Sequence, residues 1–300
     1  MQVSTYSNAS NAEGTGRRSG LILLLGVLLP SLLLLVNLYT QWGSLVFDTE
    51  AAKNVEATSL QMSFGEHKQW YLWINFGVII FPFLLSFDKR VHFYRKWWAV
   101  MPAIAINAAF FLVWDVLYTR VGVWGFNDRY IDGMLLGLPY GEWLFFITVP
   151  YACVFVHECL TAYIRTDIFR SLDRWLTPAL ILLLLGVGLW QWQRLYTSWT
   201  FLLPAGMLAA HYIAVENTYR TRFYLSFLVC LVPFLLTNGI LTGAFNQEPV
   251  VIYNDAHNLT SLIGSRFITI PYDDFAYGFL LIFVPVVLFE ELRKRVTSDE

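Results

Sequence analysis

Two short segments of the sequence place carboxylic acids at the start of apolar runs. Residues 138–143 and 270–275 share a Pro-Tyr-x-acid core, and each apolar run ends at a glutamate nineteen residues after the proline, Glu158 and Glu290. Ionisable groups in an apolar bundle are costly, so a duplicated one indicates a functional site. The structural alternative is a pair of acidic helix caps favoured by the helix dipole, which explains one such residue better than a repeated pattern.

The correspondence extends upstream of both motifs. In each half a polar residue precedes a threonine by four positions and an aromatic-asparagine pair follows: Asp115, Thr119 and Phe126-Asn127, then Asn238, Thr242 and Tyr253-Asn254. A carboxylic acid in apolar surroundings stays protonated more readily than in water, because burial disfavours its charged form. Such an acid can donate a proton to an alkene.

Aromatic residues gather around the acidic motifs, in a chain with 12 Trp, 16 Tyr and 24 Phe. Some of them are an ordinary interfacial belt. Those near the motifs are Trp114, Trp124, Phe126, Tyr140, Trp143, Phe145, Phe146, Tyr253, Tyr272, Phe275 and Tyr277. Because ring faces stabilise cations, an acid walled by such rings is what a proton-initiated isoprenoid cyclisation requires.

The composition predicts an all-α integral membrane protein. Of the 300 residues, 57% are hydrophobic and 14% are charged, and the apolar residues lie in long continuous runs. About eight transmembrane helices are predicted, near residues 20–39, 70–87, 97–117, 143–160, 176–192, 198–215, 223–242 and 275–290. Several of these spans are at the short end for a bilayer helix.

The basic residues predict the orientation. With the N-terminus inside, fourteen of the 20 Lys and Arg residues fall on the inner side and six on the outer side, as the positive-inside rule demands. Both termini are therefore expected in the cytoplasm. Arg17-Arg18 precede a long first span without a convincing cleavage site, which favours a retained anchor over a signal sequence. Residues 1–19 are predicted to be disordered.

The second, third and fourth spans match the sixth, seventh and eighth. Because the offset of four helices is even, the two halves should cross the membrane in the same sense, related by a pseudo-twofold along the membrane normal. Both acidic motifs would then face the outer side and converge on one cavity. The predicted units are an N-terminal region with an extra helix (1–65), a first repeat (66–165), a linking helix (166–196) and a second repeat (197–300). The connections near 118–142 and 243–274 are long, as functional loops often are.

The sequence lacks the motifs that several other kinds of chemistry require. There is no GxGxxG dinucleotide motif after a strand, no histidine pair at helical spacing, no lysine within a span and no basic stripe for nucleic acid. We therefore predict no metal, no cofactor and no nucleic-acid partner. The three cysteines are expected to pack as small hydrophobes. Asp128 and Asp132 have the spacing of a magnesium–diphosphate site, but Arg129 is the one basic neighbour, which favours two solvated loop aspartates.

An ordered series of motifs between about residues 70 and 292 resembles a known family. The matching segments are residues 81–90, 114–115, 122–127, 138–139 and 142–146 in the first half, and 233–234, 238–243, 248–254, 269–271, 274 and 277–278 in the second. In these segments the chain is similar to bacterial lycopene cyclases of the heterodimeric type in their fused form, and to the cyclase half of fungal bifunctional carotenoid enzymes.

The resemblance implies a redox-neutral cyclisation of the linear ends of lycopene, or a similar carotenoid, to β-type ionone rings. It implies an isomerase in a bacterial inner membrane, with a linear carotenoid and membrane lipid as partners. An acid would protonate the terminal double bond, the neighbouring alkene would close the ring, and a base would remove a proton.

The resemblance also implies roles for individual residues. Glu142, Asp273 and Asp274 would form the acid/base set. Asp115, counted with the catalytic residues, and Asn238 would orient them from corresponding helices. Arg266 would neutralise a spare carboxylate. The substrate-binding residues would be Trp114, Trp124, Phe126, Asn127, Trp143, Asn238, Tyr253, Asn254, Arg266 and Tyr277.

The chain departs from the family pattern in three places. Gly141 stands where similar cyclases carry the first of two acids, Asp273-Asp274 replace a Glu-Asp pair, and the segment near residues 261–265 is longer than expected. Two alternatives stay open: a related membrane cyclase or hydratase acting on another isoprenoid chain, or a degenerate paralogue that binds carotenoid. Ring type, the number of ends cyclised and the oligomeric state also stay open.

Overall fold

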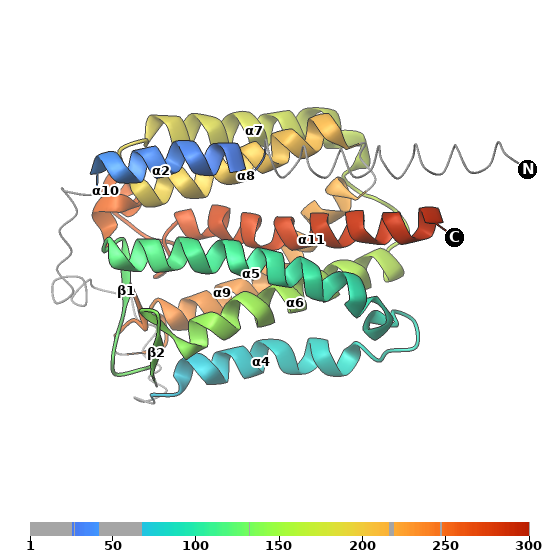
Figure 1. Ribbon diagram of the computed structural model, residues 1–300, viewed down its shortest axis with the longest axis horizontal. Helices are drawn as coiled ribbons and strands as arrows, with labels where there is room; N and C mark the ends of the chain where they lie inside the picture. The colour runs from blue at the N-terminus through green and yellow to red at the C-terminus, as the bar shows by residue number, and fades with distance from the viewer. Residues whose placement is uncertain are drawn as a thin grey trace, which may run out of the picture.

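The computed structural model describes residues 26, 28–41, 68–131, 133–215, 219–246 and 248–299, and most of these are helical. The α-helices are α2 (Leu29–Gln41), α4 (Trp70–Leu85), α5 (Trp97–Arg120), α6 (Tyr140–Tyr163), α7 (Asp173–Trp190), α8 (Leu195–Ala214), α9 (Arg220–Leu241), α10 (Thr260–Ile263) and α11 (Asp273–Asp299). The 3-10 helices are η3 (Phe93–Lys96), η4 (Arg170–Leu172) and η5 (Asp255–His257). The long helices form one elongated bundle (Figure 1).

The apolar runs of the sequence account for these helices. Five helical segments are long and apolar enough to cross a membrane: Phe93–Arg120, Tyr140–Tyr163, Arg170–Trp190, Arg220–Leu241 and Asp273–Arg295. The helices α2 and α4 are apolar but shorter. Each of the eight predicted spans overlaps a helix of the structure. The all-α membrane fold is therefore confirmed, while the count of eight crossings and their orientation stay predictions.

Helices α6 and α11 form the centre of the bundle. The helix α6 packs against α4, α5 and α9, and α11 packs against α5, α8 and α9. By contrast, α7 and α2 pack on α8 at one side, as Figure 1 shows. In the apolar window of α11, 78% of the residues are buried, against 17% for α7. The helices that open with the two acidic motifs are thus central.

This arrangement is the one that a tandem repeat would produce. Helix α6 contacts α4 and α5 of its own half and α9 of the other half, while α11 contacts α8 and α9 of its own half and α5 of the other. The helix α7 lies within the predicted linking segment. The repeat and its domain boundaries stay predictions. The N-terminal segment that was predicted to be disordered and the loop predicted before residue 66 lie outside the described residues.

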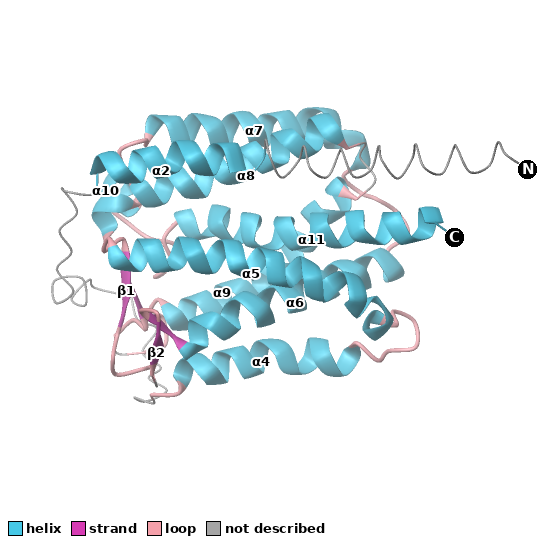
Figure 2. Cartoon of the chain, viewed as in Figure 1, coloured by secondary structure: helices cyan, strands magenta, loops and turns pink. Residues whose placement is uncertain are grey.

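Two small antiparallel ladders cover one end of the bundle. Strand β1 (Trp124–Phe126) pairs with β4 (Val251–Tyr253), with Trp124 opposite Tyr253. Strand β2 (Met134–Leu135) pairs with β3 (Leu138–Pro139). Figure 2 shows these strands in magenta at a single end. The two long connections predicted to be functional are therefore hydrogen-bonded to each other beside the starts of α6 and α11.

The opposite ends of α6 and α11 carry a network of ion pairs. Glu158 pairs with Lys96 at 2.5 Å and with Arg293 at 2.9 Å, and Arg293 also pairs with Glu290 at 2.9 Å. The glutamates that end the two apolar runs therefore bind the same guanidinium. Their partners explain how these buried charges are tolerated.

A second buried ion pair links α7 to α9. Arg220 is 2% exposed and donates to both oxygens of Asp173, at 3.0 and 2.5 Å. Removing one partner of a buried pair leaves an uncompensated charge.

We expect Arg220→Gln to lower the free energy of unfolding by about 3 kcal/mol, measured as a lower denaturation midpoint in detergent. The control is Arg174→Gln on the exposed side of α7, and equal midpoints for both variants would contradict this account.

Candidate active site

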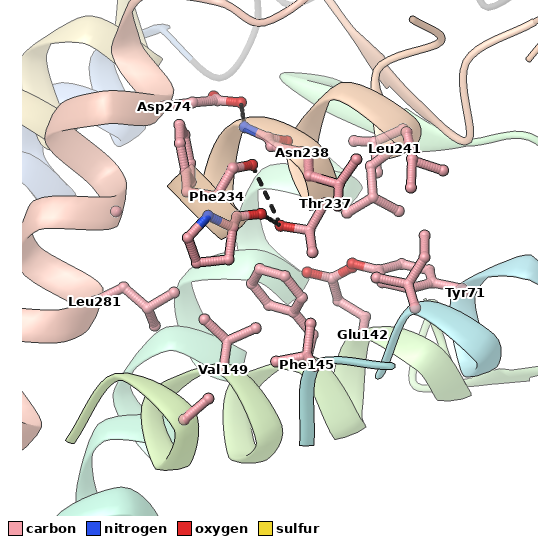
Figure 3. A pocket seen from close by; sticks show the side chains of 18 of the residues that line it. Tyr71, Glu142, Phe145, Val149, Phe234, Thr237, Asn238, Leu241, Asp274 and Leu281 are labelled. Carbon is pink, nitrogen blue, oxygen red and sulfur yellow. Dashed lines mark hydrogen bonds between the residues drawn. The ribbon is translucent and has the colours of Figure 1, made fainter. Parts of the chain in front are cut away.

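An apolar cavity of about 530 Å³ lies among α4, α6, α9 and α11. Hydrophobic and aromatic side chains form most of its wall. Its carboxyl groups belong to two polar clusters, shown in part in Figure 3, where Glu142 with Tyr71 and Asp274 with Asn238 lie on different sides of the pocket. A few polar groups in an apolar concavity are typical of a small-molecule site.

The first cluster joins two carboxyl groups. Glu142, in the first turn of α6, accepts a hydrogen bond from the Tyr71 hydroxyl of α4. Asp115 of α5 accepts one from Trp124 Nε1 at 2.6 Å. Glu142 and Asp115 both line the cavity, and Asp115 Oδ2 has no hydrogen-bond partner among the described residues. Because two buried like charges in one site disfavour each other, this arrangement favours a proton on one of the two carboxyl groups.

The second cluster surrounds one carboxyl group with three donors. Asp274 accepts from the Tyr196 hydroxyl at 2.5 Å, from Asn238 Nδ2 at 2.7 Å and from the Tyr253 hydroxyl at 3.0 Å. Burial raises the pKa of Tyr253 well above its usual range, and the nearby Asp274 adds to this rise, so the phenol remains a donor at neutral pH. The three donors offset part of the cost of burying the charged form of Asp274.

The structure brings together the four residues predicted from corresponding positions, Asp115, Glu142, Asn238 and Asp274. Sequence reasoning missed the two tyrosines that bind the acids, Tyr71 and Tyr196. Each tyrosine is the second residue of its helix, α4 or α8. The internal repeat, extended to the starts of these two helices, is the sequence signal that identifies both tyrosines.

Aromatic rings form a continuous wall beside the acids. The Tyr277 ring lies 5.1 Å from the rings of both Phe111 and Trp114, centroid to centroid, and 6.4 Å from that of Trp124. Tyr277, Trp124, Phe126 and Tyr253 line the cavity, while Trp114 packs behind Tyr277 and does not line it. The ring faces suit a transient cation near the acids.

Asp273 is buried away from the cavity wall. It accepts from the Thr197 hydroxyl at 2.6 Å and from the backbone N–H of Leu259 at 2.9 Å, and it does not line the cavity. It therefore ties the start of α11 to α8 and to the preceding loop. Asp273 therefore fits the structural alternative of an acidic helix cap. Glu142 and Asp274, by contrast, face the cavity.

Four other predicted binding residues hold the covering loops and do not line the cavity. Their hydrogen-bond pairs are Asn127–Glu248, Asn254–Gly122, Trp143–Leu135 and Arg266–Asp255, at 2.8, 3.1, 3.1 and 2.6 Å. Arg266 thus neutralises a loop aspartate. Its guanidinium also lies 5.8 Å from the centre of the Tyr253 ring. These residues keep the cover in place over the site.

Within the described residues, no group of three or more His, Cys, Asp or Glu side chains could hold a metal ion. Asp132 lies outside the described residues, so the alternative of a diphosphate site at Asp128 and Asp132 is not tested. The expected independence from metals and cofactors stays a prediction.

Gly141 lies against the tyrosine that binds Glu142. A Cβ atom at this position would be 2.4 Å from Tyr71 Cγ. We expect Gly141→Ala to displace Tyr71 and to lower the denaturation midpoint in detergent, because the clash involves the stiff base of the ring. The control is Gly239→Ala in α9, whose Cβ would meet its nearest neighbour at 3.6 Å. A Gly141→Ala midpoint equal to that of the control would show that Tyr71 moves freely.

A protein-family model described as lycopene cyclase matches residues 68–160 and 193–292 of the chain. No curated protein and no solved structure matches the chain. The two matched regions cover well over half of the sequence, and each begins three residues before one of the tyrosines that bind the acids, Tyr71 and Tyr196. Both carboxyl clusters lie on residues within the matched regions. The chain therefore belongs to the lycopene cyclase family.

Proposed function

We propose that this protein is a lycopene cyclase that closes the linear ends of a carotenoid into β-type rings by acid–base chemistry. One observation carries the proposal: two differently hydrogen-bonded carboxyl clusters meet a single apolar cavity with aromatic walls. Family membership supports a linear carotenoid as substrate. The apolar wall suits a hydrocarbon that offers no polar group for recognition.

The pair Glu142 and Asp115 is the proposed proton donor. Sharing one proton between two buried carboxyl groups keeps an acid available at neutral pH. The proton adds to the terminal double bond of the substrate and leaves a tertiary carbocation. Tyr71 orients Glu142 through its hydroxyl, and Trp124 orients Asp115. Glu142 is the residue that transfers the proton.

Ring closure and proton loss complete the reaction. The neighbouring alkene attacks the cation and forms the ring bond, which moves the positive charge to a ring carbon beside the aromatic wall. Asp274, whose charge its three donors stabilise, removes a proton from the adjacent carbon and restores a double bond. One proton is added and one is lost, so substrate and product have the same mass. Exchange with water then resets the site, because Asp274 releases its proton and the acid pair takes up another.

The absence of an acid at position 141 is compatible with this chemistry. Asp273, the corresponding residue of the second half, binds Thr197 and Leu259 and does not line the cavity. A longer side chain at Gly141 would have to displace Tyr71. Glycine here therefore preserves the Tyr71–Glu142 contact, which favours an active enzyme over a degenerate paralogue.

The first test is the pigment profile of lycopene-accumulating cells that express this chain. We expect ring-bearing products of unchanged mass, identified by chromatography, absorption spectra and mass spectrometry. In deuterated water each ring should gain one deuterium, because the added proton comes from an exchangeable carboxyl group. Products heavier by one water per end would indicate hydration, and unaltered lycopene with a well-inserted protein would contradict the proposal.

Replacing the donor should remove activity without unfolding the protein. We expect Glu142→Gln to lower the cyclisation rate about 10²- to 10⁴-fold, the usual contribution of a general acid, while the denaturation midpoint changes little. The control is Asp128→Asn, which removes an exposed loop carboxylate and should act as the parent does. A Glu142→Gln rate near that of the parent would exclude Glu142 as the donor.

Replacing the base should change the product as well as the rate. The base selects which proton leaves the cation, so we expect Asp274→Asn to slow cyclisation and to raise the fraction of other ring isomers. Asp273→Asn should instead lower the denaturation midpoint and leave the isomer ratio unchanged, because Asp273 does not line the cavity. Chromatographic separation of the isomers checks both variants. An altered ratio in Asp273→Asn alone would reverse the assignment.

A further inference from the structure

The cavity opens at one side of the bundle. Of its lining residues, those with exposed positions all lie on two helices: Trp73, Gly77 and Phe81 on α4, and Pro233 and Leu236 on α9. The lining residues contributed by α6 and α11 are buried or half-buried. Helices α4 and α9 are neighbours with few contacts between them. The mouth of the cavity is therefore a gap in the apolar flank between α4 and α9.

The end of the cavity near the acids is closed. Trp124 of β1 and Val251 and Tyr253 of β4 line the cavity there and are buried. The β1–β4 ladder joins these strands across the end of the bundle. A hydrocarbon that reaches the acids must therefore pass the mouth between α4 and α9 and not the covered end.

The cavity is shorter than a linear carotenoid. Its lining residues on α6 run from Glu142 to Val156, which corresponds to about 21 Å of helix at roughly 1.5 Å per residue. An extended lycopene molecule is a stiff rod longer than this, with a reactive group at each end. One end can occupy the cavity while the remainder projects through the mouth.

We infer that the mouth between α4 and α9 takes one end of the carotenoid directly from the lipid, while the rest of the polyene lies on the exposed apolar stripe of Trp73, Phe81 and Leu236. This inference rests on the proposed function and adds a lateral substrate path to it. The stripe residues are 59%, 68% and 56% exposed, and the path is continuous with the cavity. The two ends of the substrate are then cyclised in separate binding events.

Gly77 is the position in the mouth at which a substitution can test this path. It lines the cavity midway along α4, and a Cβ atom there would meet nothing within 4 Å. A side chain there would therefore enter the mouth without a clash at its Cβ atom. It would also improve the helix propensity of the position, since glycine is among the least favourable helix residues.

The test compares Gly77→Phe with Gly186→Phe. Gly186 in α7 also has open space around its Cβ position but does not line the cavity. In liposomes containing lycopene, Gly77→Phe should lower kcat/KM about tenfold, a barrier increase of about 1.4 kcal/mol. Gly77→Ala should have a smaller effect, and Gly186→Phe should act as the parent does.

A second readout is independent of turnover. Purified Glu142→Gln protein should retain linear carotenoid, and adding Gly77→Phe should lower the retained pigment about tenfold. Unchanged kcat/KM and unchanged retention in Gly77→Phe would overturn the lateral path while leaving the cyclase proposal intact. Disulfide cross-linking of two copies through Trp73→Cys would also overturn it, because a protein partner would then cover the mouth. Lack of cyclisation by the parent chain would instead reject the proposed function itself.

Discussion

The pairing of buried carboxyl groups inside an apolar bundle is the constraint on which the rest of the structure depends. A polar group that is cut off from water must find its partners within the protein. Asp274 meets this demand with three donors, Glu142 meets it with Tyr71, and Asp115 meets it with Trp124. These partners come from α4, α8, α9, β1 and β4, so satisfying three acids fixes the relative positions of most of the bundle.

The two ends of the bundle handle charge in different ways. At one end, the carboxyl groups that line the cavity are held by phenol, indole and amide donors, which carry no positive charge. At the other end, Glu158 and Glu290 pair with Arg293, and Arg220 pairs with Asp173. Full ion pairs stabilise the charged form of both partners. Neutral donors leave protonation adjustable, which is what an acid–base site needs, and a hydrocarbon substrate competes with none of them.

Gly141 and Asp273 show how related positions come to differ in role. Both immediately precede the acid that faces the cavity, Glu142 or Asp274. In the second half the position has room for a carboxylate that accepts from Thr197 and Leu259. In the first half the Tyr71 ring occupies the space that a side chain would need. Two acids in a motif therefore need not mean two acids in the chemistry.

The sequence by itself determined the membrane helices and the positions of the key acids, because apolar runs and their flanking acids are local patterns. Asp115, Glu142, Asn238 and Asp274 could be singled out from spacing and resemblance. Only the tertiary structure decided which groups meet, since Tyr71 binds Glu142 across 71 residues of chain and Tyr196 binds Asp274 across 78. The same holds for the separation of Asp273 from the cavity and for the open flank between α4 and α9. These features arise from the packing of helices side by side, which the pattern within one helix does not specify.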